Sequence, residues 1–330
     1  MSENQLLSVV VPVFNEAEVL PVFSERLRKV VDSLESMSYE VIFVDDGSTD
    51  ESFQQLRAIA GSDSRVRIIK LSRNFGHQMA ITAGIDEAQG DAVVVIDADL
   101  QDPPEVIKTF VEKWRSGYDV VYGVREKREG EGWLKRLSAN LFYRTLKPLA
   151  QIDIPLDAGD FRLMSKRVVR QLSHMKERGR FVRGLVSWVG FQQIGVRYSR
   201  DRRYAGETKY PYRKMINFAL DGVTSFSTMP LQFATWLGYF ASLLAFLYAI
   251  SVFVQKILGY TVQGWATIMV GVLFLGGVQL ICLGIMGEYI GRIFNEIKQR
   301  PMYVVDEVYE GNRGSVGDQI SDRRRTASRP

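Results

Sequence analysis

The sequence predicts an α/β protein in which a mostly parallel sheet carries helices on both faces and is followed by a C-terminal hairpin of two transmembrane helices. Two observations lead to this fold class. The first part of the chain alternates short runs of β-branched apolar residues with segments of helical periodicity. The last third contains two apolar runs that are each long enough to cross a bilayer.

The chain begins with a strand and a helix that differ in apolar periodicity. Residues 6–14 centre on three consecutive valines, which is typical of a strand buried on both faces. Residues 16–34 repeat apolar residues every three or four positions and are expected to form an amphipathic helix. A second strand is expected at 39–44, and Thr49 or Asp50 then caps the next helix.

The same alternation continues to the end of the first third of the chain. Strands are expected at 66–71, 92–96 and 120–122, and helices are expected at 77–88 and 103–115. Because strand and helix alternate, the strands are expected to lie parallel and to be joined by right-handed crossovers.

A basic, aromatic-rich region precedes a second α/β stretch. Residues 124–147 interleave Lys and Arg with Trp, Leu and Phe, which fits either a solvated helix packed on the sheet or a helix at a membrane surface. Helices are then expected from Ser165 and at 183–189, followed by a strand at 192–196. The cytoplasmic α/β domain is expected to occupy residues 1–212.

The C-terminal third predicts a membrane domain. An interfacial amphipathic helix is expected at 213–228, and two transmembrane helices, at about 231–254 and 265–287, are expected within residues 229–300. Lys and Arg precede the first apolar run and follow the second, so the positive-inside rule places both chain ends in the cytoplasm of a cell with an inner (plasma) membrane. A helical hairpin buried in a soluble core is the alternative.

Glycines in the second apolar run favour close helix packing and a homo-oligomer formed through the transmembrane helices. The remaining tail, 301–330, is expected to hold a short strand at 302–305 and to be disordered beyond it.

Composition excludes several classes of protein. The net charge is only +4 and no nucleic-acid-binding motif is present, so nucleic acid is not an expected partner. The single cysteine, Cys282, excludes a disulfide within the chain and fits a reducing compartment. The N-terminus lacks the features of a signal peptide. Neither a P-loop nor a dinucleotide-binding glycine motif occurs.

The residues after the fourth expected strand carry the strongest functional signal. Asp97 and Asp99 are separated by one residue, and Gln101 follows two positions later. Mg²⁺ and Mn²⁺ prefer oxygen ligands, and ligands bind at the carboxyl ends of strands in open α/β sheets. These three residues therefore predict a site for a divalent metal and a phosphorylated ligand. Asp102 is expected to cap the helix that begins at Pro103.

Two further strand ends place polar and aromatic residues at the same edge of the predicted sheet. Pro12, Phe14 and Glu16 lie at the end of the first strand, and Asp45 and Asp46 at the end of the second. Asp45 can accept the imide N–H of a uracil, and Pro12 and Phe14 can pack on its ring. Turn formation and helix capping are the alternative for each of these segments.

Together these segments resemble glycosyltransferase family 2, whose nucleotide-diphospho-sugar-binding domain has the GT-A fold. More narrowly, the chain resembles the polyprenyl-phosphate glycosyltransferases, which include dolichol-phosphate mannose synthases and bacterial bactoprenol-phosphate glucosyltransferases. The resemblance covers about residues 6–300, and the two C-terminal runs resemble the bacterial branch. The segments that carry it are Val-Pro-Val-Phe-Asn-Glu (11–16), Val-Asp-Asp-Gly-Ser-Thr-Asp (44–50), Ser-Arg-Asn-Phe-Gly-His-Gln (72–78), Asp-Ala-Asp-Leu-Gln-Asp-Pro-Pro (97–104) and Gly-Asp-Phe-Arg-Leu (159–163).

The resemblance implies a role for each group of residues. The residues expected to bind the nucleotide sugar are Pro12, Phe14, Glu16, Asp45, Asp46, Arg73, Asp97 and Ala98. The residues expected to hold Mg²⁺ or Mn²⁺ are Asp97, Asp99 and Gln101. The residues expected to bind the acceptor phosphate are Arg125, Arg136, Arg200, Arg202 and Lys209. Asp99 and Asp157 are the expected catalytic residues, with Asp157 as the candidate general base.

Two other residues have open roles. His77 can act as a base, but it is more readily explained as the first residue of a helix because Gly76 precedes it. Asp157 and Asp160 lie on either side of Gly159, where each can act as a base, orient the sugar or form a turn.

The predicted function is inverting, metal-dependent transfer of one sugar, most readily glucose from UDP-glucose, to polyprenyl (undecaprenyl) phosphate. The Gln-x-x-Arg-Trp motif of processive polysaccharide synthases is absent, which favours transfer of a single sugar. Mannose and N-acetylglucosamine donors remain open. The alternatives from other classes are a non-catalytic, membrane-anchored nucleotide-sugar-binding partner of a flippase and, with little support, a small channel.

Overall fold

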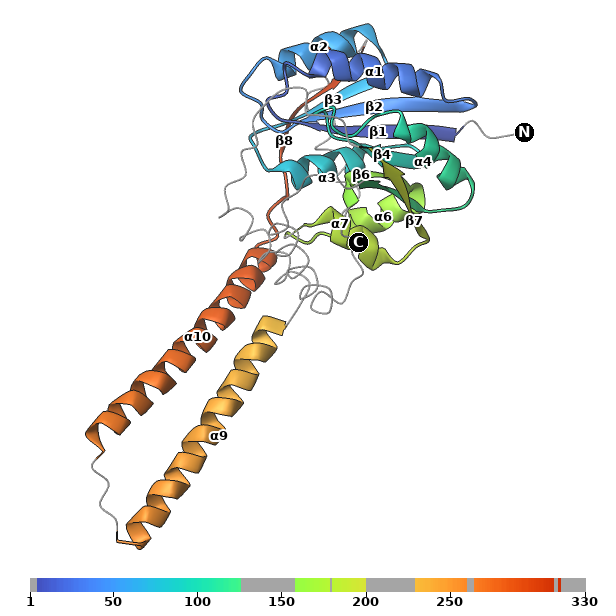
Figure 1. Cartoon of the computed structure of the whole chain (residues 1–330). Coiled ribbons are helices and arrows are strands. Elements are labelled where there is room, and N and C mark those ends of the chain that lie inside the picture. Colours follow the sequence, from blue (N-terminus) through green and yellow to red (C-terminus); the bar gives the residue numbers. More distant parts are fainter. Residues whose placement is uncertain are drawn as a thin grey trace, which may run out of the picture. The chain divides into compact units, whose positions relative to one another are not determined.

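The computed structural model describes residues 5–125, 158–178, 180–199, 229–259, 264–311 and 314–315 (Figure 1). They fall into two compact units. One contains a sheet built from the described residues up to 199 together with the segment after residue 300, and the other contains two long helices. Most of the basic segment 124–147, the expected interfacial helix at 213–228 and most of the tail lie outside the described residues.

The first unit is organised around a mixed sheet with nine described strands in the order β7-β5-β6-β4-β1-β2-β3-β8-β9. The four strands β4, β1, β2 and β3 are parallel, as the sequence predicts, and β5 and β7 are parallel to each other. Strands β6, β8 and β9 pair antiparallel with their neighbours. The strands are β1 (Gln5–Val13), β2 (Met37–Asp45), β3 (Val66–Leu71), β4 (Ala92–Val95), β5 (Val120–Arg125), β6 (Ala158–Ser165), β7 (Gln193–Tyr198), β8 (Val305–Glu310) and β9 (Gly314–Ser315).

The register of the central strands brings three strand ends to one edge of the sheet. Val13, the last residue of β1, pairs with Asp45, the last residue of β2. On the other side of β1, Val10 pairs with Val95, and the N–H of Ile96 still donates to the Val10 carbonyl oxygen. The residues that follow β1, β2 and β4 therefore emerge at the same edge.

Helices cover both faces of the central strands, as the sequence predicts (Figure 1). Buried side chains of α1, α2 and α4 pack on one face, and those of α3 pack on the other. Gly84 lets α3 lie directly on β1, because a Cβ at that position would come within 2.2 Å of Val10 Cγ1. The helices of this unit are α1 (Leu20–Asp32), α2 (Ser52–Ser62), α3 (His77–Glu87), α4 (Val106–Arg115), α6 (Lys166–His174) and α7 (Val182–Val189).

Strand β6 is the main feature that the sequence pattern does not predict. It lies antiparallel between β4 and β5, so it interrupts the parallel order. Phe161 and Leu163 of β6 are buried in the apolar core, while Asp160 and Arg162, at alternate positions, are buried as well. A strand with charged residues buried on one face departs from the apolar runs by which the other strands were predicted.

The segment after the second long helix returns to the sheet. Strand β8 pairs antiparallel with β3, and it begins at Val305 rather than at the expected residue 302. Just before it, Tyr303 is buried against Ile42, Ile69 and other apolar residues on the α3 face of the sheet. The Tyr303 hydroxyl donates to Asp86 Oδ2 at 2.9 Å. The return segment is thus part of the core of this unit.

The second unit consists of α9 (Met229–Ile257) and α10 (Trp265–Ile297). Both helices are long and apolar enough to cross a membrane, and only 6% of the most apolar 18-residue window of each is buried. Their large apolar side chains are therefore exposed, which does not fit the alternative of a hairpin buried in a soluble core. The predicted α/β class with two long apolar C-terminal helices is confirmed.

Candidate active site

The turn after β4 places two carboxylates at the edge where the central strands end. Asp97 directly follows the last residue that is bonded to β1, and Leu100 then adopts a positive φ of 57° that reverses the chain. Asp99 Oδ1 accepts a hydrogen bond from the Gln101 N–H at 3.0 Å, so the Asp99 carboxylate stabilises this turn. The carboxyl-end location predicted for these residues is the one that the structure has.

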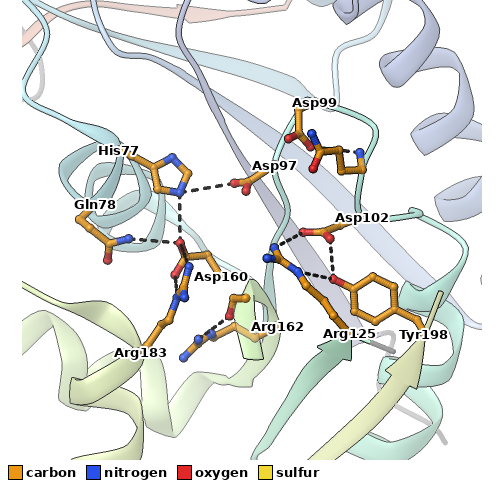
Figure 2. Close-up of polar contacts among 12 residues, drawn as sticks. His77, Gln78, Asp97, Asp99, Asp102, Arg125, Asp160, Arg162, Arg183 and Tyr198 are labelled. Carbon is orange, nitrogen blue, oxygen red and sulfur yellow. Dashed lines mark hydrogen bonds and ion pairs between the residues drawn. The ribbon is translucent and has the colours of Figure 1, made fainter. Parts of the chain in front are cut away.

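Asp97 points from this turn toward His77, the first residue of α3 (Figure 2). Its Oδ1 lies 3.5 Å from His77 Nε2. Among the described residues, this buried oxygen has no hydrogen-bond partner. Burial raises the pKa of Asp97 to about 6, although the neighbouring His77 lowers it. The Asp97 carboxylate is thus held in a position where a bound cation would stabilise its charge.

Asp160 of β6 joins this pair to α7. Arg183 donates to both Asp160 oxygens, at 2.7 and 2.9 Å, and His77 Nε2 lies 3.3 Å from Asp160 Oδ2. Gln78 donates to the same oxygen at 3.3 Å. Burial would raise the pKa of Asp160, but the hydrogen bonds from Arg183 and His77 hold it well below its ordinary value. Asp160 is therefore an anion that holds Arg183, Gln78 and His77, and His77 in turn lies next to Asp97 (Figure 2).

His77 has a second role beside its place at the start of α3, which the sequence predicts. Burial lowers the pKa of His77, but the charge of Asp97 and the hydrogen bond to Asp160 raise it by more, to about 9. The imidazole is therefore protonated at neutral pH and stabilises both carboxylates. In this arrangement His77 serves as a hydrogen-bond donor to Asp160, and a role of His77 as a general base stays a prediction.

Asp102 does not cap a helix, which corrects the interpretation from the sequence. Helix α4 begins at Val106 with Glu105 at the N-cap position, and a turn at Pro103 and Pro104 precedes it. The Asp102 carboxylate is fully buried and accepts hydrogen bonds from the Tyr198 hydroxyl and from Arg125 Nη2. Burial and the Asp102 carboxylate both raise the pKa of Tyr198, so its hydroxyl stays protonated and remains a donor.

Asp45 and Asp46, at the end of β2, have different surroundings although they are neighbours. Asp46 uses both oxygens to accept the N–H groups of Phe75 and Gly76, at 2.7 and 2.9 Å, and thereby fixes the loop before α3. Asp45 Oδ1 accepts the Ser48 N–H at 3.2 Å. Asp45 Oδ2 is buried and has no partner in the part of the chain that the structure describes. Burial raises the pKa of Asp45.

The other residues expected to bind the nucleotide lie around the same edge. Pro12 and Ala98 are buried, Phe14 is 44% exposed and Glu16 is half-buried. Arg73 lies in the loop after β3, where its guanidinium stacks on Phe75 at 3.9 Å from the ring centroid. Their contacts with a nucleotide stay a prediction.

Several expected site residues lie outside the described residues, namely Arg136, Asp157, Arg200, Arg202 and Lys209. Of the residues expected to bind the acceptor, Arg125 is therefore the one whose surroundings are known. The structure adds Arg183 and Tyr198 to the site and gives Asp160 a definite role. Alternating apolar and charged residues in 158–165 is the signal that can reveal β6, whereas no local pattern identifies Arg183 or Tyr198.

The predicted metal ligands can be tested against these contacts. In the described part of the chain, no group of three or more His, Cys, Asp or Glu side chains is arranged to hold a metal ion. The predicted set has only two carboxylates and an amide, and the orphaned, buried Oδ1 of Asp97 fits a hard cation. Asp97 and Asp99 therefore fit a divalent metal by their donor chemistry.

Two family models match the chain. The model described as glycosyl transferase family 2 matches residues 8–173, and the model described as GtrB C-terminal hairpin matches residues 229–293. The first match covers most of β1, the strands β2 to β6 and the turn with Asp97 and Asp99, and the second covers α9 and most of α10.

Relatives match over almost the whole chain. The uncharacterized glycosyltransferase YkcC of Bacillus subtilis is 51% identical over 310 residues, which are 94% of this chain and 96% of the relative. The bactoprenol glucosyl transferase of Shigella phage SfII is 44% identical over 307 residues, which are 93% of this chain and 99% of the relative. Among solved structures, glucosyl-3-phosphoglycerate synthase from Mycobacterium tuberculosis with Mn²⁺, UDP and glucosyl-3-phosphoglycerate has a TM-score of 0.43 at 19% identity, covering 66% of this chain and 76% of that chain.

Proposed function

The chain belongs to glycosyltransferase family 2, and from this premise we propose that it transfers a single glucose from UDP-glucose to a polyprenyl phosphate, with inversion at the anomeric carbon. The acceptor class is supported by the bactoprenol glucosyl transferases, which match this chain over both the sheet unit and the helical hairpin. A lipid acceptor also gives a physical reason for two long, exposed apolar helices in a sugar-transferring enzyme.

One observation carries the proposal for the donor. Two buried carboxylate oxygens, Asp45 Oδ2 and Asp97 Oδ1, have no hydrogen-bond partner among the described residues. Asp45 is the last residue of β2 and Asp97 follows β4, and only β1 lies between these two strands in the sheet. A buried carboxylate oxygen without a hydrogen bond is costly, and at Asp97 Oδ1 the ion pair with His77, at 3.5 Å, offsets part of that cost. A ligand that supplies an N–H to Asp45 and a cation to Asp97 would therefore stabilise both. A uridine diphosphate with a divalent metal has this chemistry.

The base and the diphosphate of the donor are assigned to different strand ends, the base to those of β1 and β2 and the diphosphate to the turn after β4. Asp45 Oδ2 would accept the N3–H of uracil, and the exposed ring of Phe14 would pack on the base. Asp97 and Asp99, with Gln101 beside them, would hold Mg²⁺ or Mn²⁺ at the diphosphate. When bound, the metal supplies positive charge where the leaving UDP develops negative charge. His77 and its partner Asp160 would hold the Asp97 carboxylate in place.

The acceptor phosphate attacks the anomeric carbon from the side opposite UDP, so a β-linked product is expected from the α-linked donor. Arg125, at the end of β5, is 31% exposed and would bind the phosphate. The attacking oxygen is already anionic at neutral pH, so the reaction does not require removal of a proton. Asp157 remains the candidate for a general base if the acceptor is protonated.

The location proposed for the enzyme is the inner membrane, with α9 and α10 as transmembrane helices and both chain ends in the cytoplasm, where UDP-sugars are made. The apolar length of both helices and the Lys and Arg outside them support this topology. A homo-oligomer formed through these helices is also proposed, on the basis of the glycines of α10.

The test uses the purified full-length chain in detergent with radiolabelled UDP-glucose and undecaprenyl phosphate. The expected result is a lipid-extractable, labelled product whose mass equals that of the acceptor plus one hexose, formed only with a divalent cation. A parallel panel of UDP-N-acetylglucosamine and GDP-mannose determines the sugar. Binding of UDP-glucose without any lipid product would contradict the proposal and favour a non-catalytic nucleotide-sugar-binding protein.

A further inference from the structure

Arg125 lies at the end of β5, where the parallel strand β7 also ends. Arg125 and Tyr198 are the last residues of these strands and are direct partners in the ladder. Asp102, in the turn before α4, lies next to both side chains (Figure 2). Three residues that are far apart in the sequence are thus brought together beside the predicted acceptor site.

The contacts form a closed ring that leaves one side of the guanidinium open. Arg125 Nε donates to the Tyr198 hydroxyl oxygen at 3.4 Å, and Nη2 donates to Asp102 Oδ2 at 3.4 Å. The Tyr198 hydroxyl in turn donates to Asp102 Oδ1. No hydrogen bond from Arg125 Nη1 is found in the ranges that the structure describes, and the Arg125 side chain is 31% exposed although Asp102 is fully buried. The ring therefore fixes one edge of the guanidinium and leaves donors available to a ligand.

Two glycines provide the space that this arrangement needs. A Cβ at Gly159 would come within 2.7 Å of Arg125 Nη2, so the backbone of β6 approaches the guanidinium directly. A Cβ at Gly123 would come within 2.6 Å of the Tyr198 ring, which also packs edge-on against Phe161 with the ring centroids 5.8 Å apart. The aromatic ring of Tyr198 and the guanidinium of Arg125 are therefore confined by steric contacts as well as by hydrogen bonds.

We propose that Asp102 and Tyr198 are positioning residues that hold Arg125 ready for the acceptor phosphate, with Gly159 leaving room for the guanidinium. This inference rests on the proposed function, because it takes Arg125 as the phosphate-binding residue. An Arg side chain that is already oriented loses less conformational freedom when it binds a phosphate, and its two-pronged geometry suits the phosphate oxygens. Loss of this hydrogen-bonded ring should therefore raise the KM for the acceptor phosphate and leave the KM for UDP-glucose unchanged.

The first test is the substitution Tyr198→Phe, which keeps the packed aromatic ring and removes only the hydroxyl. The KM for undecaprenyl phosphate is expected to rise roughly tenfold, since a hydrogen bond in a charged network is lost. The KM for UDP-glucose and the affinity for UDP are expected to stay within about twofold of the wild type. Gly159→Ala, which crowds Arg125 by a different route, is expected to raise the acceptor KM as well.

A matched control is available in the same unit. Tyr39 also donates its hydroxyl to a carboxylate, Asp32, beside an arginine, Arg65, but it lies in the first half of β2, away from the carboxyl-end edge. Tyr39→Phe is expected to leave both KM values unchanged. If Tyr39→Phe and Tyr198→Phe alter the acceptor KM equally, the effect is a general loss of stability and the proposal is overturned.

A double-mutant cycle separates positioning from other effects. Arg125→Lys alone should raise the acceptor KM, and adding Tyr198→Phe to it should cause no further rise if Tyr198 acts through Arg125. Additive effects, or an unchanged acceptor KM in Tyr198→Phe with an active wild type, would overturn this inference alone. A wild-type chain that forms no lipid-linked sugar would overturn the proposed function, and this inference with it.

Discussion

At the scale of single residues, the role of a carboxylate at the edge where the central strands end depends on which hydrogen bonds its oxygens accept. Asp46 has both oxygens bound to backbone N–H groups of a loop, so it stabilises the fold. Asp45, its neighbour, keeps one buried oxygen that has no hydrogen-bond partner among the described residues. Asp160 is saturated by Arg183, His77 and Gln78. The carboxylates with an orphaned oxygen are therefore the ones expected to bind a ligand, and the saturated ones are expected to hold the site together.

Asp97→Asn tests the metal site with almost no change in volume. Sugar transfer is expected to fall at least about a hundredfold in kcat/KM, because a neutral amide holds a divalent cation poorly at the diphosphate. The unfolding temperature is expected to change little, since Asp97 Oδ1 makes no hydrogen bond to any described residue and the burial that raises the pKa of Asp97 offsets its attraction to His77. Near-normal transfer by the purified, folded variant would contradict the assignment of Asp97 to the metal.

Asp45→Asn tests recognition of the base. Its new amide group can donate where the Asp45 oxygen only accepts, so the affinity for UDP is expected to fall by about tenfold while CDP, whose N3 is an acceptor, loses less or gains. The measurement is the ratio of UDP to CDP affinity by calorimetry for both proteins. An unchanged ratio would show that Asp45 does not contact the base.

At the scale of elements, the sequence predicts the helices and strands whose apolar residues follow one strong periodicity. The buried strand that ends at Val95 and the amphipathic α1 were predicted from valine runs and from apolar residues every three or four positions. β6 was missed because Asp160 and Arg162 occupy a buried face, which only tertiary contacts with Arg183 and others can stabilise.

In the candidate site too, residues with a local sequence signal were predicted, and residues that meet only through tertiary contacts were not. The carboxylates of the turn after β4 were found because they are only one residue apart in the sequence and follow a recognisable strand. Asp102 was misinterpreted, because Pro103 suggests a helix start, whereas its partners Tyr198 and Arg125 are distant in the chain. Contacts between separate strands leave no local pattern, so sequence reasoning could not assign them.

Tyr303→Ala tests whether the return segment belongs to the core of the sheet unit. Tyr303 is 5% exposed, packs in the apolar cluster beside α3 and donates to Asp86, so its truncation is expected to cost about 3 kcal/mol of unfolding free energy. Val304→Ala is the neighbouring control, since Val304 is 47% exposed and its truncation should cost no more than about 0.5 kcal/mol. Denaturant unfolding of both purified variants provides the comparison, and equal losses would contradict the assignment.

At the scale of the whole molecule, a sheet unit with charged residues at its edge is joined to a unit whose side chains are mostly exposed and apolar. The surface of the sheet unit suits water and that of the helical unit suits lipid, so the chain is expected to carry a site for a water-soluble donor and a lipid-facing domain on one polypeptide. The proposed crossing of the membrane by the hairpin, and its direction, are then testable properties of the entire chain.

Two matched lysine substitutions test that direction. Lys256 lies near the end of α9 and Lys298 directly follows α10, so a hairpin with both chain ends in the cytoplasm places them on opposite sides of the membrane. In a Cys282→Ala background, a membrane-impermeant maleimide added to intact spheroplasts is expected to label Lys256→Cys and to leave Lys298→Cys unlabelled. Inverted vesicles should give the reverse, and labelling of both residues from one side would contradict the topology.

The pairing of β8 with β3 has a consequence for how the protein is made. The ribosome completes both long apolar helices before it synthesises the strand that covers the edge of β3. Until then, the backbone N–H and C=O groups along that edge lack their strand partner and Tyr303 is missing from the core cluster. Folding of the sheet unit is therefore completed only after α9 and α10 have been synthesised, and if these helices cross the membrane as proposed, maturation of the enzyme would follow their insertion.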